Sequence, residues 1–314
     1  MSASASSLTP SDEAAPGHPG MAVLALLFNA FVWGVSWWPF RYLQGLGLHP
    51  LWTTALVYVL AVALIALRWP GAMRELLRTP VLWVLVLASG STNAAFNWAV
   101  SIGDVVRVVL LFYLMPLWTV LLARLLLDER LGKLAALRVV LALAGALAVL
   151  SPGSIDATAA WPVPSGLADW LGVAGGFFFA LNNVMLRREA QRSAQAKGLA
   201  MFLGGVLVAG GMAIVLSAAG AVALPPVPQA QWVLPALVLA LAFLTSNMAL
   251  QYGASRLRAN ATSVVMISEV GFASVSAVLL GSQKLATSLL LGGGLILSAA
   301  VLAALEPRER DVAL

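Results

Sequence analysis

The side chains that could do chemistry inside the apolar runs of this sequence are mainly amides, hydroxyls and aromatic rings. Asn29, Trp33 and Trp37 recur every four residues, which places them on one face of a helix. Asn93 and Asn97 share a face by the same spacing. Amides bind and orient a ligand but do not transfer protons, so the pattern indicates a binding cavity rather than a catalytic site. Hydrogen bonding between helices is the alternative for any single asparagine.

Glu269 is an acid well inside an apolar run, between Ser268 and Val270. A carboxylate at such a place is costly unless it is paired, protonated or wetted by a cavity. We therefore regard Glu269 as a candidate for proton coupling or for binding a substrate ammonium group. The alternative is a protonated or backbone-bonded acid that only holds helices together, and the sequence leaves both possibilities open.

The stretch Tyr113-Leu114-Met115-Pro116 lies within another apolar run. A proline removes a backbone donor and disturbs the helix one turn before it, which frees a carbonyl near the middle of the run. We interpret Pro116 as a kink that could act as a gate, with Tyr113, Met115 and Trp118 around it as a lip for a flat or apolar ligand. A packed structural kink is the alternative, and such kinks are common in membrane helices.

The composition excludes several function classes. The chain has no cysteine and two histidines, so disulfides, thiolate sites and a histidine metal centre are not expected, and no cofactor is predicted. Its net charge is +5, but the basic residues lie singly or in small groups between apolar runs, which argues against a nucleic-acid partner. An enzyme would need a convergent nucleophile and base. The inward polar residues do not supply that set, so we do not expect an enzyme.

Long apolar runs make up most of the chain. Hydrophobic residues account for 61% and charged residues for 10%, against about 25% charged in soluble domains. A run of about 20 apolar residues spans a bilayer, and its backbone is satisfied internally as a helix. The sequence therefore predicts an all-α integral membrane protein with ten transmembrane helices. The expected runs are Met21–Phe40, Leu51–Leu67, Val81–Ile102, Val108–Leu127, Leu134–Leu150, Leu171–Leu186, Leu199–Ser217, Trp232–Tyr252, Ala259–Leu280 and Leu285–Leu305.

The distribution of basic residues sets the expected orientation. When the N-terminus is placed inside, all of the 18 lysines and arginines except Arg41, Arg107 and Lys284 fall in inner segments. Because inner loops of membrane proteins carry the excess of lysine and arginine, we expect both termini to be cytoplasmic. The expected location is a bacterial inner membrane.

A weak internal repeat divides the chain. Trp98–Gly103 is followed by Pro116, and the similar stretch Met248–Gly253 is followed by Glu269. Since each half would hold five helices, the second copy would be inverted relative to the first, a recurring plan in transporters. The expected parts are a disordered cytoplasmic tail (1–20), a first five-helix repeat (21–150), an extracytoplasmic linker (151–167), a second five-helix repeat (168–305) and a cytoplasmic tail (306–314).

The chain resembles the drug/metabolite transporter superfamily through Trp33-Gly34, the helix with Pro116, Asp128-Glu129-Arg130-Leu131 with Gly145, and the second copy around Glu269. That superfamily has two EamA-type halves of five helices each, and the resemblance covers about residues 21–305. The tail, the size and the stretch Tyr113–Pro116 are similar to the YddG-type bacterial exporters of aromatic amino acids. There are two departures, because Val270 stands where the second half usually has proline and Gln283 where an acid usually closes the helix.

The resemblance implies a secondary transporter that exports small amphiphilic metabolites, above all aromatic and other amino acids, by alternating access through a central cavity. Aromatic and thioether side chains there could hold a ring, and amides could meet a carboxylate and an ammonium group. The implied substrate-binding residues are Trp33, Asn93, Asn97, Tyr113, Met115, Phe179, Asn183 and Tyr252, with Glu269 for coupling and Pro116 as a kink or gate.

Other readings stay open from the residues alone. The solute could belong to a different metabolite or drug class, since amphiphilic and sugar-like solutes also fit a cavity of amides and aromatic rings. A membrane-embedded enzyme or a scaffold without a solute path are the remaining alternatives. The expected partners are a small-molecule substrate and the lipid bilayer, and the oligomeric state is left open.

Overall fold

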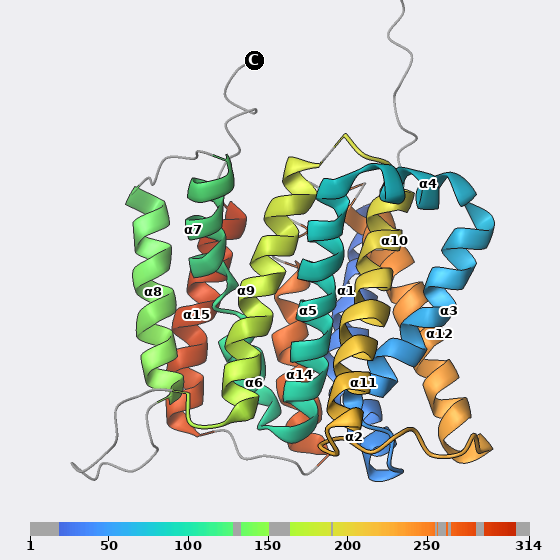
Figure 1. Cartoon of the computed structure of the whole chain (residues 1–314). Coiled ribbons are helices and arrows are strands. Elements are labelled where there is room, and N and C mark those ends of the chain that lie inside the picture. The colour runs from blue at the N-terminus through green and yellow to red at the C-terminus, as the bar shows by residue number, and fades with distance from the viewer. Residues whose placement is uncertain are drawn as a thin grey trace, which may run out of the picture.

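The structure is a computed structural model that describes residues 19–127, 133–150, 164–189, 191–254, 256, 262, 265–280 and 286–305. Every regular element within these ranges is a helix and none is a strand, which confirms the expected all-α class (Figure 1). The motif Asp128-Glu129-Arg130-Leu131, Gln283, most of the expected linker and nearly all of the two expected tails lie outside the described residues. The helices are α1 (Pro19–Val35), α2 (Trp37–Gly45), α3 (Pro50–Arg68), α4 (Pro70–Arg78), α5 (Pro80–Ile102), α6 (Val105–Phe112), α7 (Met115–Leu127), α8 (Lys133–Leu150), α9 (Leu167–Arg188), α10 (Ala194–Gly204), the π-helix η1 (Gly205–Ala209), α11 (Gly210–Ala218), α12 (Ala230–Ala254), α14 (Ser268–Leu279) and α15 (Thr287–Leu305).

Several helical stretches can cross a membrane by their length and composition. Five qualify singly, and a sixth candidate joins α4 and α5, which meet at an angle of 104°. Shorter apolar helices lie within α8, α14 and α15. The chain is therefore a multi-pass membrane protein by these features, while the count of ten spans stays a prediction. The five single stretches are Gly20–Gly45, Pro50–Arg68, Val105–Leu126, Ala194–Ala218 and Ala230–Ala254.

Helix α4 differs from the sequence expectation, which has no helix between the runs Leu51–Leu67 and Val81–Ile102. Proline at the first helical position loses no hydrogen bond and has the right φ, so Pro70 starts a helix that continues to Arg78. Pro80 starts α5 in the same way after Thr79. The two prolines thus turn one connection into a short helix that lies across the end of the bundle (Figure 1).

Two candidate spans, and the stretch that leads into α14, are interrupted. Helix α1 gives way to α2 at Ser36, three residues before Pro39, and α6 gives way to α7 at Tyr113-Leu114, just before Pro116. Both breaks follow from the missing proline N–H. Helix α14 begins after a third break at Ile267, although Val270 stands where a proline would be. Local sequence chemistry explains the first two breaks but not the third.

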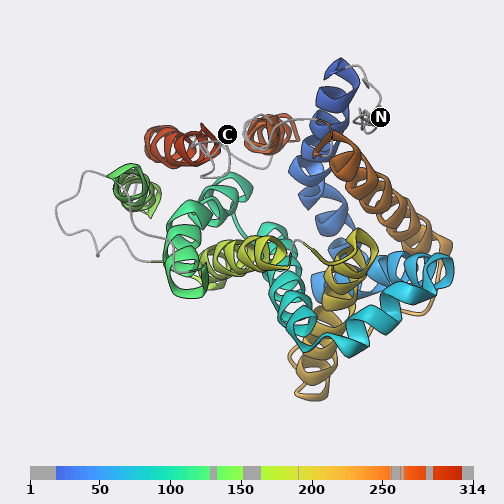
Figure 2. The same cartoon turned by 90° about the horizontal axis from the view of Figure 1, so that it is seen from above.

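Seven helices form a closed ring, which we call the circuit, in the order α12, α1, α14, α6, α9, α5 and α3. Each helix contacts the next, and α3 contacts α12. The same arrangement is visible from above (Figure 2). The pair α8 and α15 packs outside this circuit against α6 and α7, and α10 with η1 and α11 packs outside α3 and α5. This circuit determines which side chains can meet near the centre of the molecule.

Glycines permit the closest helix contacts. A Cβ added at Gly145 of α8 would lie 2.7 Å from the carbonyl oxygen of Gly292 of α15. A Cβ at Gly204 of α10 would overlap the carbonyl oxygen of Val86 of α5. Small residues let membrane helices approach closely, so these positions set the spacing of the outer helices around the circuit.

Candidate functional site

Tyr113 and Glu269 meet at two of the helix breaks. The Tyr113 hydroxyl lies 3.4 Å from Oε2 of Glu269, to which it can donate, and 3.5 Å from the carbonyl oxygen of Met266. Tyr113 is buried, and Glu269 is half-buried. The contact joins residues 156 positions apart and links α6 and α7 to α14. It places an acid and a phenol beside each other near the middle of the Val105–Leu126 stretch.

Trp33 lies on α1, the helix that neighbours α14 in the circuit. Its ring stacks on Phe243 of α12 with 4.6 Å between centroids, and it packs against two of the hydrophobic clusters. The next residue, Gly34, approaches α14 so closely that an added Cβ would lie 2.7 Å from the carbonyl oxygen of Glu269. Helix α1 therefore holds the half-buried Trp33 ring close to the backbone of the acid.

Phe179 of α9 and Met115 of α7 pack against the same hydrophobic cluster as Trp33. The Phe179 ring lies 5.2 Å from Phe112, and both Phe179 and Met115 are half-buried and pack against one hydrophobic cluster. A Cβ at Gly176 of α9 would overlap the carbonyl oxygen of Phe112. Pro116 has no N–H to donate to that carbonyl, so the break in the helix and the glycine of α9 meet at one point.

Asn93 and Asn97 both form hydrogen bonds with helix α3. The Tyr58 hydroxyl donates to Oδ1 of Asn93 at 2.7 Å, and Nδ2 of Asn97 donates to Oγ1 of Thr54 at 3.0 Å. Asn97 has no exposed surface, whereas Asn93 is half-buried. In this conformation Asn97 therefore holds α5 to α3, and only Asn93 keeps accessible surface.

Two further candidates are Asn183 and Tyr252. Asn183 is half-buried on α9, while its neighbour Asn182 is buried. Tyr252 is 36% exposed near the end of α12, with the Arg256 guanidinium 3.7 Å above its ring. Gly253 packs near the start of α1, far along the helix from Phe243 and Trp33. The structure thus brings together Trp33, Tyr113, Met115, Phe179 and Glu269, but not Tyr252.

Sequence reasoning overlooked several polar contacts between helices. Tyr58, in the apolar run Leu51–Leu67, bonds Asn93 and packs its ring on Phe202 and Phe243. Nε1 of Trp37 donates to Oγ of Ser276 at 2.9 Å and ties α2 to α14. A tyrosine in the middle of an apolar run was the available signal for the first contact, because a buried hydroxyl needs a partner.

A charged cluster closes the end of the bundle opposite α4. Arg107 of α6 binds both carboxylate oxygens of Asp169 of α9, at 2.8 and 2.9 Å, and donates to the carbonyl oxygen of Val149 of α8 at 2.7 Å. The backbone N–H and hydroxyl of Ser165 also donate to Asp169. A bidentate arginine–carboxylate pair is among the strongest side-chain contacts, so this cluster fixes three helices together.

Asp104 and Arg41 extend this cluster. The Asp104 side chain accepts from the backbone N–H of Arg107 at 2.8 Å and caps α6. Arg41 donates to the carbonyl oxygens of Val100 and Gly103, at the end of α5. Burial raises the pKa of Asp104, although Arg107 and Arg41 counteract the rise. This carboxyl group therefore takes up a proton more easily than an exposed aspartate does.

We expect Asp169→Asn to lower the free energy of unfolding by roughly 2 kcal/mol, because it leaves the partly buried Arg107 without its charged partner. Chemical unfolding in detergent micelles measures this loss. Glu189→Gln is the matched control, since its partner Arg192 is 45% exposed and such pairs contribute about 0–1 kcal/mol. Equal loss in both variants would contradict a structural role for the Arg107–Asp169 pair.

The cluster around Tyr113 and Glu269 has the composition of a binding site for an amphiphilic molecule. Within the described residues, no group of three or more His, Cys, Asp or Glu side chains could hold a metal ion. The aromatic rings and the thioether offer apolar surface, and the carboxyl and phenol groups offer polar contacts. Such an arrangement can bind and orient a small molecule near the middle of the bundle.

Comparison with known proteins gives a consistent result. Residues 20–151 match the EamA-like transporter family. A protein of Pseudomonas aeruginosa, described as an uncharacterized transporter, is 40% identical over 89 residues, which cover 27% of this chain and 30% of that relative. A solved crystal structure of a protein has a TM-score of 0.53 at 18% identity and covers 94% of this chain and 99% of that chain. At that identity the likeness extends to the fold alone. The EamA match begins at the start of α1 and ends after α8, so it covers the first half of the described bundle.

Proposed function

We propose that the whole chain is an EamA-type secondary transporter that exports small amphiphilic metabolites, foremost aromatic and other amino acids. The observation that carries this proposal is the meeting of Tyr113 and Glu269 at two helix breaks, with Trp33 and Phe179 packed against the hydrophobic cluster that contains Tyr113. Interrupted helices near the midplane are where secondary transporters bind their solutes. The EamA match and the transporter relative support the same class of function.

The pairing of helices supports ten spans in two inverted halves. In the proposed repeat α1, α3, α5, α7 and α8 correspond to α9, α10, α12, α14 and α15. Under this correspondence the contact of α5 with α9 matches that of α12 with α1, and the contact of α7 with α9 matches that of α14 with α1. The pair α5 and α10 becomes α12 and α3, and the pair α8 and α15 maps onto itself. The helix breaks agree, since Tyr113 precedes Pro116 by three residues and Ile267 precedes Val270 by three.

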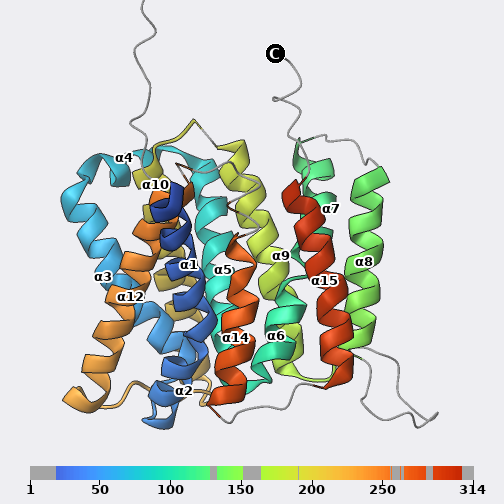
Figure 3. The ribbon, with the colours of Figure 1, turned by 180° about the vertical axis from the view of Figure 1, so that it is seen from behind.

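The proposed orientation places both termini in the cytoplasm of a bacterial cell, with the chain in the inner membrane. The start of α1 and the end of α15 lie at the same end of the bundle (Figure 3). That end, which we call the basic end, also carries α4 with Arg74 and Arg78 and the end of α9 with Arg187 and Arg188. Inner surfaces of membrane proteins carry such an excess of arginine.

In the proposed site the apolar and polar parts of the solute have separate contacts. Trp33, Met115 and Phe179 would hold an aromatic ring, and Tyr113 would position Glu269. Glu269 would bind the ammonium group or a coupling proton. Asn93 and Asn183 are half-buried and would meet the carboxylate, whereas Asn97 and Tyr252 would reach the solute only in another conformation of the transport cycle.

Transport by the purified protein in liposomes tests the proposal. The panel comprises labelled aromatic, aliphatic and cationic amino acids and a sugar, each with protein-free liposomes as the control. Saturable, protein-dependent movement of the aromatic members is expected. If no member of the panel moves while the protein is folded, the amino-acid assignment is wrong; movement of the sugar alone would replace it by a different solute class.

We expect Phe179→Ala to weaken transport of an aromatic amino acid about fivefold and that of a small aliphatic one much less, because ring contacts contribute about 0.5–1.5 kcal/mol. The ratio of initial rates for the two solutes measures this selectivity. Phe178→Ala is the control, since it removes an adjacent ring that packs on Phe177. Equal loss for both solutes would show that Phe179 only supports the fold.

A further inference from the structure

Helix α4 lies across the basic end of the bundle, between the end of α3 and the start of α5. It meets α5 at 104°, so it runs nearly parallel to the plane that the spanning helices cross (Figures 1 and 3). Ala72 and Leu76 are buried and pack in one cluster with Ala196 and Leu199 of α10. The helix is therefore fixed to the bundle by one face, and its other faces remain outside.

The outer faces of this region combine cationic and apolar side chains. Arg68, Arg74 and Arg78 are exposed, and Arg74 and Arg78 share a face because they are four residues apart. Trp69 is 43% exposed and Leu77 is 63% exposed. Basic amphipathic helices with tryptophan are typical of the boundary between lipid headgroups and acyl chains.

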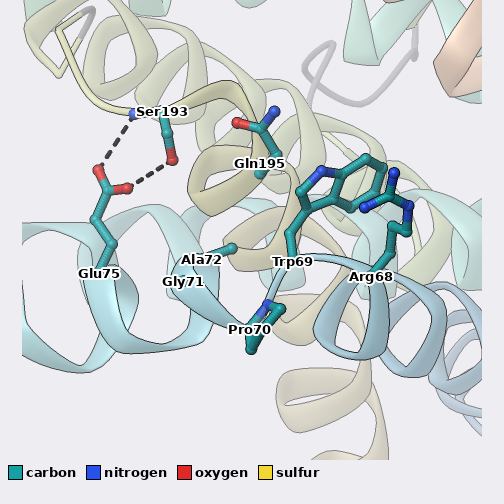
Figure 4. Close-up of a pocket in the computed structure, with 8 residues that line it drawn as sticks. All are labelled: Arg68, Trp69, Pro70, Gly71, Ala72, Glu75, Ser193 and Gln195. Carbon is teal, nitrogen blue, oxygen red and sulfur yellow. Dashed lines mark hydrogen bonds between the residues drawn. The ribbon is translucent and has the colours of Figure 1, made fainter.

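A pocket lies between this helix and the start of α10. It is lined by Arg68, Trp69, Pro70, Gly71, Ala72, Glu75, Ser193 and Gln195 (Figure 4).

The charges in the pocket are separated. Glu75 turns toward Ser193, whose hydroxyl donates to it at 2.6 Å and whose N–H donates at 3.2 Å. Arg68 lies on the other side, with its guanidinium 5.3 Å from the centre of the Trp69 ring. The carboxylate is thus occupied by Ser193, and the arginine side of the pocket is cationic.

Apolar surface continues from this pocket along α3. Leu67 is 82% exposed and Leu64 is 43% exposed, one and four residues before Arg68. A soluble anion would not contact this surface, whereas the acyl chains of a phospholipid would cover it. The juxtaposition of a cationic pocket and exposed leucines therefore favours a lipid over a free phosphate.

We propose that this pocket binds the headgroup of an anionic phospholipid, with the phosphate at Arg68 and the acyl chains along Leu64 and Leu67, while the exposed Arg74 on α4 adds positive charge at the same end of the bundle. The site is separate from the cluster around Tyr113 and Glu269, and it does not depend on the transported solute. Bound lipid fastens α4 to the membrane surface and holds the connection between α3 and α5 in place.

Native mass spectrometry of the purified protein, with phosphatidylglycerol or phosphatidylcholine added, tests this site. Each exposed arginine near a membrane surface contributes enough to change affinity about fivefold, so Arg68→Gln with Arg74→Gln should weaken phosphatidylglycerol binding roughly 25-fold. Arg124→Gln with Lys133→Gln is the matched control, because it removes two exposed cations on α7 and α8, away from α4. This control should bind within about twofold of the wild type.

Any of four outcomes would overturn the proposal. Phosphatidylglycerol would bind the variant with Arg68→Gln and Arg74→Gln as tightly as the wild type. Alternatively, the control variant would lose as much affinity for phosphatidylglycerol as that variant does. Phosphatidylcholine would bind the wild type equally well, which would remove the role of lipid charge. Inorganic phosphate at millimolar concentration would displace the lipid completely, which would make the pocket a site for free phosphate. Gel filtration of each variant confirms that it is folded.

Discussion

Glu269→Gln is expected to reduce transport driven by a pH gradient to less than a tenth of the wild-type rate. Glutamine keeps the size and most hydrogen-bonding capacity of the side chain but cannot gain or lose a proton. If Glu269 carries the coupling proton, a gradient can no longer drive the solute, whereas exchange of labelled for unlabelled solute at equal pH continues. Transport into liposomes with an imposed pH gradient, compared with exchange at equal pH, measures the difference.

Glu75→Gln is the control for this experiment. Glu75 is a half-buried carboxylate that bonds Ser193 at the basic end, outside the proposed solute path. Its substitution should leave gradient-driven transport unchanged. If Glu269→Gln transports as well as the wild type under a gradient, Glu269 is not the coupling group. If it loses both exchange and gradient-driven transport, its role is in binding the solute instead.

Gly204→Ala is expected to cost about 3 kcal/mol of unfolding free energy, because overpacking a tight contact costs about 1–3 kcal/mol and occasionally more. The added Cβ would overlap the carbonyl oxygen of Val86 and lie 2.8 Å from the backbone nitrogen of Gly90. Both are backbone atoms, so α5 and α10 would have to move apart. Chemical unfolding in micelles, followed by helical circular dichroism, measures the loss.

Gly198→Ala on the same helix is the matched control. A Cβ at Gly198 would meet nothing within 4 Å, and alanine is a better helix former than glycine by about 1 kcal/mol. This variant should be as stable as the wild type or slightly more stable. If Gly204→Ala unfolds at the same denaturant concentration as Gly198→Ala, the close contact between α5 and α10 is wrong.

The two halves of the proposed repeat differ at the site itself. Met115 and Glu269 occupy corresponding places, since each immediately precedes the position of Pro116 or Val270. A thioether on one side and a carboxyl group on the other give the site an apolar and a polar side. Under the proposed function this asymmetry orients an amphiphilic solute, and a symmetric pair of acids would not.

Composition and proline chemistry were sufficient for much of the fold. Runs of apolar residues with 10% charged residues overall predicted helices in a membrane, because a bilayer leaves backbone groups no other partner. Pro39 and Pro116 account for the breaks at Ser36 and Tyr113, since each removes a backbone donor at a known offset. Local chemistry of this kind acts within one helical turn and can be read directly from neighbouring residues.

Tertiary structure alone decided which side chains meet. Asn97 was expected in a cavity but is buried against Thr54, and Tyr252 lies at an exposed helix end beside Arg256. The contact between Tyr113 and Glu269 and the break at Ile267 had no local signal. In a soluble helix, an apolar stripe shows which face is buried. In a membrane, both lipid and protein interior are apolar, so the sequence leaves the rotation of each helix open, and packing between helices determines it.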